Sequence, residues 1–231
     1  MIQEGALIVS CQADAGSPFD HPELIAAFAR AAVMGGAAGL RLEGAANIAA
    51  VRSQGSLPLI GLIKRRGGDG DGSDGGYITP DVADVEAVHE AGAGIIAFDA
   101  TLRPRPVPVA ELVREIHARG RLALADIATA KEAVAALHAG ADMVGTTLSG
   151  YTPYSPKLEG PDLELIGELA ALGIRPLAEG RLRTPAEAAA ALERGAWAVV
   201  VGSAITRPEM VTSWFVAALT GPKALETDAR A

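Results

Sequence analysis

The chain has 231 residues, of which 49% are hydrophobic and 21% charged, and its formal net charge at pH 7 is −8. This length and composition favour a single α/β domain over residues 1–231 and argue against global disorder. The acidic excess argues against a nucleic-acid partner, although a small anionic substrate would need only a local group of cations.

Cys11 is the only cysteine, so no intramolecular disulfide can form. The first residues show no export signal, and no stretch reaches the roughly 18 consecutive apolar residues of a membrane span. We therefore expect a cytoplasmic protein that does not insert into a membrane. Residues 222–231 are expected to form a flexible C-terminal tail.

Short apolar runs recur along the chain about every 20–35 residues, with Ala-rich helical stretches between them, which is typical of a (β/α)8 barrel. Nearly every run stops at a polar or charged residue, and in this fold the carboxyl ends of all strands meet at one mouth. We therefore expect the stops to share a site. In chain order they are Cys11-Gln12, Arg41, Lys64, Asp99, Asp126, Thr146-Thr147, Glu179 and Gly202-Ser203.

Two helix starts carry the spacing of a capping box, in which an N-cap side chain and an acid three residues later bond to each other's backbone. They are Asp20 with Glu23, and Thr184 with Glu187. Each precedes an Ala-rich run, so we expect helices to begin at both places.

The segment 65–76, RRGGDGDGSDGG, interrupts this rhythm. The spacing of Asp69, Asp71 and Asp74 suggests a calcium loop, but the glutamate expected near the end of such a loop is missing. We favour a loop above the barrel and expect no metal site. The four histidines are expected in helices or helix starts, away from strand ends and without metal-ligand spacing; they are His21, His89, His117 and His138.

Lys64 and Glu179 are the pair of strand-end residues that can move protons. A lysine at the mouth can form a Schiff base, act as a base or bind an anion, or it can be a charged rim residue. Glu179, in LAEG, can be a catalytic carboxylate or a helix cap. Together, an amine and a carboxylate across one mouth form a candidate acid–base pair.

The last two strand-end loops read EGRLRTP and VGSAITRP, and in many barrels these loops hold a phosphate. Glycines would let the backbone approach an anion, while a hydroxyl and an arginine would add donors and charge. The alternative is that the glycines only permit tight turns. The candidate phosphate residues are Gly180, Arg181, Gly202, Ser203 and Arg207.

Two aspartates at strand ends receive different interpretations. Asp99 is followed by Arg103 and Arg105, so a structural ion pair is at least as well supported as catalysis. Asp126 has no such neighbour in the sequence and is interpreted as a contact for sugar hydroxyls.

In chain order, the segments from LIVSCQ (7–12) to AVVVGSAITRPEMVT (198–212), which together span essentially the whole chain, resemble the N-acetylmannosamine-6-phosphate 2-epimerase family. The long blocks GTTLSGYT and VVVGSAITRP are more specific than a lone glycine motif. Two features depart from the family pattern: Ala128 stands where serine is expected, and the Gly/Asp-rich stretch after Arg65 is longer than usual. The matching segments are LIVSCQ (7–12), PLIGLIKR (58–65), YITP (77–80), FDATLRPRP (98–106), ADIAT (125–129), DMVGTTLSGYTPYS (142–155), LAEGRLRTP (177–185) and AVVVGSAITRPEMVT (198–212).

The resemblance implies an isomerase that interconverts N-acetylmannosamine 6-phosphate and N-acetylglucosamine 6-phosphate in sialic acid breakdown, with no metal or other cofactor. It implies Lys64 and Glu179 as the catalytic residues. It also implies substrate contacts at Gln12, Arg41 and Asp126, and phosphate contacts at Gly180, Arg181, Gly202, Ser203 and Arg207.

Epimerisation at C2 requires loss of the C2 proton and its return on the other face, which needs the open-chain sugar with a carbonyl at C1. Lys64 and Glu179 would exchange that proton, and Arg41 would stabilise the enolate-like oxygen. Two-base and one-base mechanisms both stay open. Burial and Arg41 would lower the pKa of Lys64 from its ordinary value of about 10.4, whereas Glu179 would raise it.

Three other functions fit the same residues. A Schiff-base aldolase would use Lys64 as its nucleophile, another phosphosugar isomerase would act on a different sugar, and a sugar-phosphate sensor would keep the pocket without the chemistry. Retention of both Lys64 and Glu179 argues against the sensor. Ala-rich helix exteriors favour self-association, and we expect a homodimer.

Overall fold

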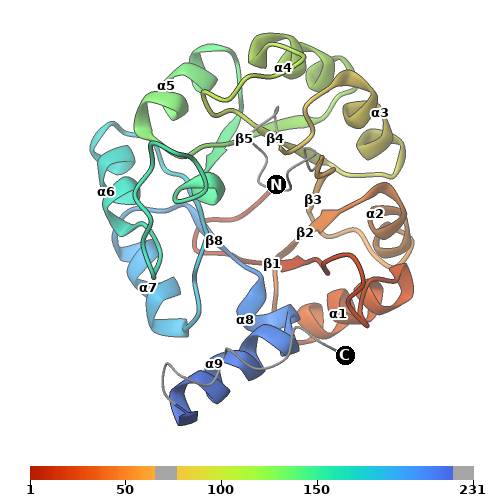
Figure 1. Ribbon diagram of the computed structural model, residues 1–231. Helices are drawn as coiled ribbons and strands as arrows, with labels where there is room; N and C mark the ends of the chain where they lie inside the picture. The colour runs from red at the N-terminus through yellow and green to blue at the C-terminus, as the bar shows by residue number, and fades with distance from the viewer. Residues whose placement is uncertain (66–76, 221–231) are drawn as a thin grey trace.

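The computed structural model describes residues 1–65 and 77–220, in which eight parallel strands close into a barrel ringed by helices (Figure 1). Strand order follows chain order, and β1 pairs with β8 to close the sheet. The predicted (β/α)8 barrel is confirmed. The strands are β1 Leu7–Cys11, β2 Gly39–Glu43, β3 Leu59–Leu62, β4 Ile95–Asp99, β5 Leu122–Asp126, β6 Met143–Gly145, β7 Leu177–Glu179 and β8 Ala198–Val201.

Between the strands lie the helices that cover the outside of the barrel. They are α1 Pro22–Met34, α2 Ala45–Arg52, α3 Val82–Glu90, α4 Val109–Ala118, α5 Ala130–His138, α6 Leu163–Ala171, α7 Pro185–Glu193, α8 Ser203–Thr206 and α9 Pro208–Thr220, with a 3-10 turn, η1, at Thr146–Leu148. Among these described helices, none is long and apolar enough to cross a membrane. The calcium-loop interpretation of Asp69, Asp71 and Asp74 and the predicted tail 222–231 lie outside the described residues.

One predicted capping box is confirmed and the other is wrong. Thr184 accepts a hydrogen bond from the backbone N–H of Glu187, and the Glu187 carboxylate accepts one from the N–H of Thr184. Helix α1 instead begins at Pro22 with His21 at the N-cap, which makes no side-chain cap. Because Pro22 presets the first helical φ angle, the helix starts one residue later than a cap at Asp20 would require.

Strand residues alternate between the inside of the barrel and the layer beneath the helices, as the pleat requires. Leu40 and Leu42 pack in the outer layer, so Arg41 between them points into the barrel. The strand continues to Glu43, and Arg41 is therefore in the middle of β2, not at its end as predicted. The same alternation turns Asp126 and Glu179 inward, because each ends its strand two residues after an interior leucine.

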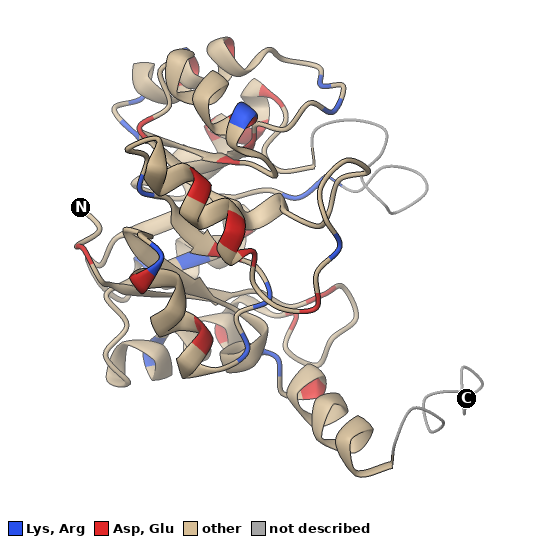
Figure 2. Cartoon of the chain, turned by 90° about the vertical axis from the view of Figure 1, so that its left-hand side faces the viewer, with Lys and Arg blue, Asp and Glu red and all other residues tan. Residues whose placement is uncertain are grey.

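Helix α9 stands apart from the rest of the fold. It projects away from the barrel at the end opposite the N-terminus (Figure 2). None of its residues is buried, and Phe215, Val216 and Leu219 are exposed. Glu209 is its only charged residue, and although Trp214 contacts Arg183, the apolar side chains of Phe215, Val216 and Leu219 lie in water.

Candidate active site

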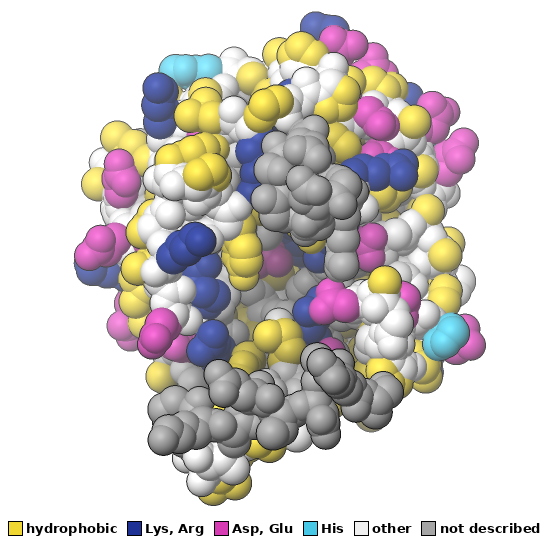
Figure 3. Space-filling view, in the orientation of Figure 1, with side chains coloured by type: hydrophobic (Ala, Val, Ile, Leu, Met, Phe, Trp, Pro, Cys, Tyr) yellow, Lys and Arg dark blue, Asp and Glu magenta, His cyan; other side chains and the backbone are white. Residues whose placement is uncertain are grey.

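A cavity of about 520 Å³ opens at the carboxyl ends of the strands. Figure 3 shows a hollow at the centre of this face, with Lys and Arg side chains along part of its rim. Among the described residues that line the cavity, basic side chains outnumber acidic ones although the whole chain is acidic, so this lining suits an anion. The basic residues are Arg41, Lys64, Arg103, Arg181, Arg183 and Arg207, and the acidic ones are Asp14 and Glu179.

The floor of the cavity holds a buried ion pair between Arg41 and Asp126. The two Nη atoms of Arg41 donate to the two carboxylate oxygens, at 2.7 and 3.3 Å, and the side chains are 1% and 0% exposed. The partner of Asp126 comes from a strand 85 residues away, so no neighbouring residue in the sequence indicated it. Asp126 lies beneath Arg41 and is not among the residues lining the cavity.

Glu179 is held at the end of β7 by its neighbours on η1 and β2. The Thr146 hydroxyl donates to the backbone carbonyl of Glu179 at 2.9 Å and accepts from its N–H at 3.1 Å. Arg41 Nε lies 3.2 Å from Glu179 Oε2, an ion-pair distance without the direction of a hydrogen bond. Burial raises the pKa of Glu179, and the nearby carboxylate of Asp126 adds to this effect. The acid form of Glu179 is therefore favoured relative to an exposed glutamate.

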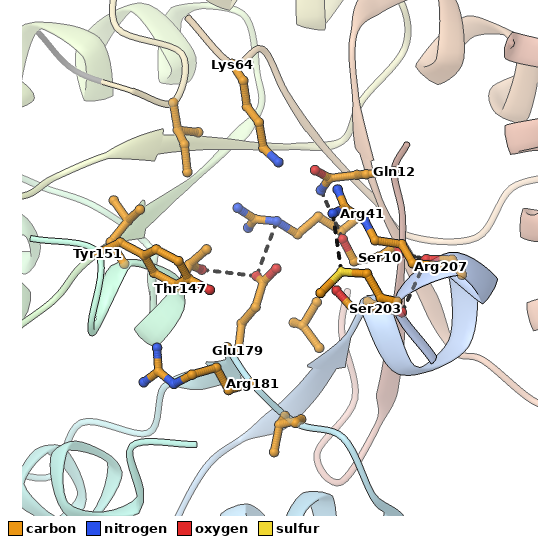
Figure 4. A pocket seen from close by; sticks show the side chains of 18 of the residues that line it. Ser10, Gln12, Arg41, Lys64, Thr147, Tyr151, Glu179, Arg181, Ser203 and Arg207 are labelled. Atoms are coloured by element: carbon orange, nitrogen blue, oxygen red, sulfur yellow. Dashed lines mark hydrogen bonds and ion pairs between the residues drawn. The ribbon is translucent and has the colours of Figure 1, made fainter. Parts of the chain in front are cut away.

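Lys64 follows β3 and points into the cavity opposite Glu179 (Figure 4). An isolated antiparallel bridge to Ile78 fixes its backbone, and Nζ lies 5.9 Å from the centre of the Tyr77 ring. Burial lowers the pKa of Lys64; Arg41 and Arg207 act in the same direction, and Glu43 and Glu179 oppose it. The pKa values of the amine and the carboxyl thus shift toward each other, which lowers the cost of moving a proton between them.

The predicted phosphate residues all line the cavity. Arg207, which follows α8, binds Asp14 through both terminal nitrogens, at 2.8 and 2.9 Å, so the guanidinium is held in place. Gly180 has φ +114°, which a residue with a side chain rarely adopts. Gly202 and Ser203 lie at the β8–α8 junction, where the backbone can approach a ligand.

Arg181 and Gln12 are partly engaged by the protein itself. Arg181 donates from Nε to the carbonyl of Gly160 and from Nη1 to the carbonyl of Ser149, each at 2.7 Å, and so holds the segment after η1. Gln12 Nε2 donates to Ser10 Oγ at 2.9 Å, which directs the amide over the cavity. Both still contribute to the cavity lining.

Asp99 and the four histidines are not among the residues that line the cavity. Asp99 pairs with Arg103 at 3.2 Å and with Arg105 at 3.8 Å, as predicted for a structural ion pair. The four histidines fall in helices or at a helix start, which is also confirmed. Within residues 1–65 and 77–220, no group of three or more His, Cys, Asp or Glu side chains is arranged to hold a metal ion.

Several residues of the site were missed by the sequence interpretation, among them Thr147, Arg183 and Trp214. Thr147 contacts both Asp126 and Glu179; it was noted only as a polar stop. Arg183 and Trp214 form a cation–π contact at the cavity edge, 5.1 Å from the guanidinium carbon to the ring centre. Only the arginine content of EGRLRTP signalled Arg183, and no pattern in α9 signalled Trp214.

The fold and cavity define a (β/α)8-barrel protein whose paired amine and carboxyl suit acid–base chemistry on an anionic ligand. The family model described as "Putative N-acetylmannosamine-6-phosphate epimerase" (NanE) matches residues 25–221. The chain belongs to this family.

Relatives and a solved structure agree with this membership. The chain is 56% identical over 211 residues to the "Bifunctional enzyme NanE/NanK" of Brucella melitensis, covering 91% of this chain but only 40% of that protein. It is 51% identical to the "Putative N-acetylmannosamine-6-phosphate 2-epimerase" of Edwardsiella ictaluri, covering 94% of this chain and 90% of the relative. The N-acetylmannosamine-6-phosphate 2-epimerase structure from Clostridium perfringens is 43% identical, with a TM-score of 0.88 over 93% of both chains.

Proposed function

We propose that this protein interconverts N-acetylmannosamine 6-phosphate and N-acetylglucosamine 6-phosphate in sialic acid breakdown. The observation that carries the proposal is Lys64 and Glu179 facing one cavity across the buried Arg41. The family membership and the activity named for the Clostridium perfringens protein support the choice of substrate.

The reaction proceeds on the open-chain sugar, whose C1 carbonyl makes the C2 proton acidic. The neutral amine of Lys64 takes this proton and becomes an ammonium ion, leaving an enolate whose charge rests largely on the C1 oxygen. The protonated carboxyl of Glu179 then gives a proton to the opposite face of C2 and becomes a carboxylate. Proton exchange with solvent restores both groups. The reverse reaction exchanges their roles.

Arg41 and the phosphate side of the cavity orient the substrate for this exchange. Burial opposes the charge of Arg41, but Asp126 and Glu179 together raise its pKa, so it stays a cation beside the developing enolate. The substrate phosphate lies near Arg207, Ser203 and the backbone of Gly180 and Gly202. Binding this remote group holds C2 between Lys64 and Glu179.

We expect proton NMR of N-acetylmannosamine 6-phosphate with the purified protein, in D2O containing EDTA, to show N-acetylglucosamine 6-phosphate with deuterium at C2. Deuterium enters because Glu179 delivers a proton drawn from solvent. Product without deuterium would instead mean that one group returns the original proton. If the folded protein gives no conversion, a different phosphosugar or a sensor becomes the better proposal.

We also propose that the protein is a cytoplasmic homodimer. Cys11 is buried as a free thiol, which suits a reducing compartment. A lone helix as short as the 13-residue α9 is marginally stable in water, so its exposed apolar face needs a cover. A second copy of the chain is the proposed cover, since α9 carries almost no charge to attract a different, charged partner.

Light scattering after gel filtration is expected to give the mass of a dimer for the wild type. The side chain of Phe215 on α9 is 68% exposed in the single chain. The substitution Phe215→Glu should give a monomer because burying a carboxylate at the interface is costly. Leu172→Glu, 56% exposed beside α6, is the matched control and should leave the dimer intact. A monomeric wild type, or equal effects of both changes, would contradict the proposed interface.

A further inference from the structure

The η1 turn places the Thr147 hydroxyl between two carboxyl groups. Its oxygen lies 2.6 Å from Asp126 Oδ1 and 3.0 Å from Glu179 Oε2 (Figure 4 shows the contact with Glu179). A hydroxyl has one hydrogen and two lone pairs, so Thr147 donates to one carboxyl at a time. It must face the other carboxyl as an acceptor.

Asp126 is the better acceptor of the two. A hydrogen bond from a hydroxyl to an ionised carboxylate is typically about 2.5–2.7 Å long, which matches the contact with Asp126 but not the longer contact with Glu179. Burial raises the pKa of Asp126, but Arg41 opposes this effect by binding both of its oxygens, whereas Arg41 makes no directed hydrogen bond to Glu179. The hydrogen of Thr147 therefore belongs on Asp126.

The chain leaves room for this contact at Gly145. A side chain there would bring its Cβ within 3.1 Å of Asp126 Oδ1 and 3.3 Å of Thr147 Oγ1. Either atom would have to move to relieve the crowding. The glycine therefore lets the hydroxyl and the carboxylate stay in contact.

With its hydrogen on Asp126, the Thr147 oxygen presents a lone pair to Glu179 Oε2. An ionised Glu179 would meet this lone pair without a hydrogen between the two oxygens, whereas a protonated Glu179 can donate to it. The cluster of one guanidinium and two carboxyls also becomes electrically neutral when one carboxyl is protonated. Since Arg41 binds Asp126 through two hydrogen bonds, the proton belongs on Glu179.

We propose that Thr147 donates to Asp126, accepts a hydrogen bond from the protonated carboxyl of Glu179, and so is a positioning residue that holds Glu179 as an acid. Its importance for turnover rests on the proposed function, whereas the direction of its hydrogen bonds does not. The charged groups that face Glu179 are Arg41, Lys64 and Asp126. Arg41 and Lys64 favour the carboxylate form of Glu179, whereas the negative charge of Asp126 favours its acid form. A Thr147 hydroxyl that accepts a hydrogen bond from Glu179 adds to the effect of Asp126.

The first test titrates Glu179 without substrate. Infrared difference spectra over a pH series follow the C=O stretch of its protonated carboxyl, identified by its loss in Glu179→Gln. In Thr147→Val, which removes the hydroxyl at constant shape, this band should disappear at lower pH than in the wild type. Thr147→Ser, which keeps the hydroxyl, should restore the wild-type midpoint. Thr147→Ala provides a second hydroxyl-free variant if the valine variant does not fold.

The direction of the shift decides the proposal. If Thr147 donated to Glu179 instead, removing the hydroxyl would destabilise the carboxylate and move the midpoint to higher pH. A midpoint that moves upward or does not move overturns the assignment. This result is independent of turnover, so it stands whether or not the protein epimerises the proposed sugar.

The second test uses turnover of N-acetylmannosamine 6-phosphate. Because less of the protein then carries the acid form of Glu179, kcat of Thr147→Val should fall by about 10- to 100-fold above its titration midpoint, with little change in KM. The pH profile of kcat should shift to lower pH, with recovery in Thr147→Ser. A loss with an unshifted profile would indicate a structural role only and would overturn the proposal.

Discussion

Replacing Lys64 with Met, or Glu179 with Gln, should lower kcat by about 10²- to 10⁴-fold, the contribution typical of a general acid or base. Each change removes one of the two groups proposed to exchange the C2 proton and leaves the proposed phosphate-binding residues intact. KM should therefore change little. The NMR assay with N-acetylmannosamine 6-phosphate measures the loss, and deuterium entry at C2 of the substrate reports whether the first proton is still removed.

The same two variants should be at least as stable as the wild type. Burial lowers the pKa of Lys64, so the charged amine is disfavoured in the fold at every pH below its unfolded pKa. Burial raises the pKa of Glu179, so its carboxylate is disfavoured above the unfolded pKa of about 4.3. At neutral pH both neutral replacements remove a cost of folding. An unchanged or higher Tm would show that lost activity reflects chemistry.

Controls for these substitutions lie on the exposed segment after η1. Lys157→Met and Glu159→Gln change the same residue types at exposed positions that do not line the cavity, and both should keep wild-type turnover. Substantial residual activity in Lys64→Met would remove Lys64 from the central role. A large loss in the control variants would mean that the assay responds to surface charge.

Arg41→Met should lower the free energy of unfolding by about 3–5 kcal/mol, because it leaves the fully buried Asp126 without its counterion. The loss should be largest at alkaline pH. Without Arg41, Asp126 and Glu179 take up protons more readily in the fold than in the unfolded chain, so stability rises as the pH falls. Urea unfolding between about pH 8 and about pH 5 measures this dependence.

Two further variants separate the buried pair from ordinary surface charge. Arg41→Met combined with Asp126→Leu should recover much of the lost stability, since apolar groups can replace a buried pair at little cost. Arg175→Met breaks an exposed pair with Glu4 of similar length, 2.6 Å, and should cost much less stability, because water screens exposed charges. Equal losses in Arg41→Met and Arg175→Met would show that burial adds nothing to this ion pair.

Local interactions made part of the site predictable. Thr184 and Glu187 are three residues apart, so their reciprocal cap forms within one helical turn and can be read directly. Asp99 and Arg103 are four residues apart and pair as predicted. The predicted cap at Asp20 was wrong although Asp20 and Glu23 have the same three-residue spacing. Pro22 moves the start of the helix by one residue.

Long-range interactions made the rest unpredictable. Asp126 meets Arg41 across 85 residues, and Arg207 meets Asp14 across 193 residues. No spacing between neighbouring residues in the sequence indicates pairs that are so far apart. They arise because the closed barrel turns alternate residues of distant strands toward one axis and brings its first and last strands together.

The sequence by itself determined the barrel and most of the chemical groups at its mouth. The apolar runs are long enough for buried strands and alternate with helical stretches. A closed parallel barrel buries every one of these runs beneath the helices. Only the tertiary structure decided how those groups work together. Burial is a property of the closed barrel, and it shifts the pKa values of Lys64 and Glu179 toward each other. The closed barrel also places Thr147 between Asp126 and Glu179. This contact depends on the register of strands β5, β6 and β7.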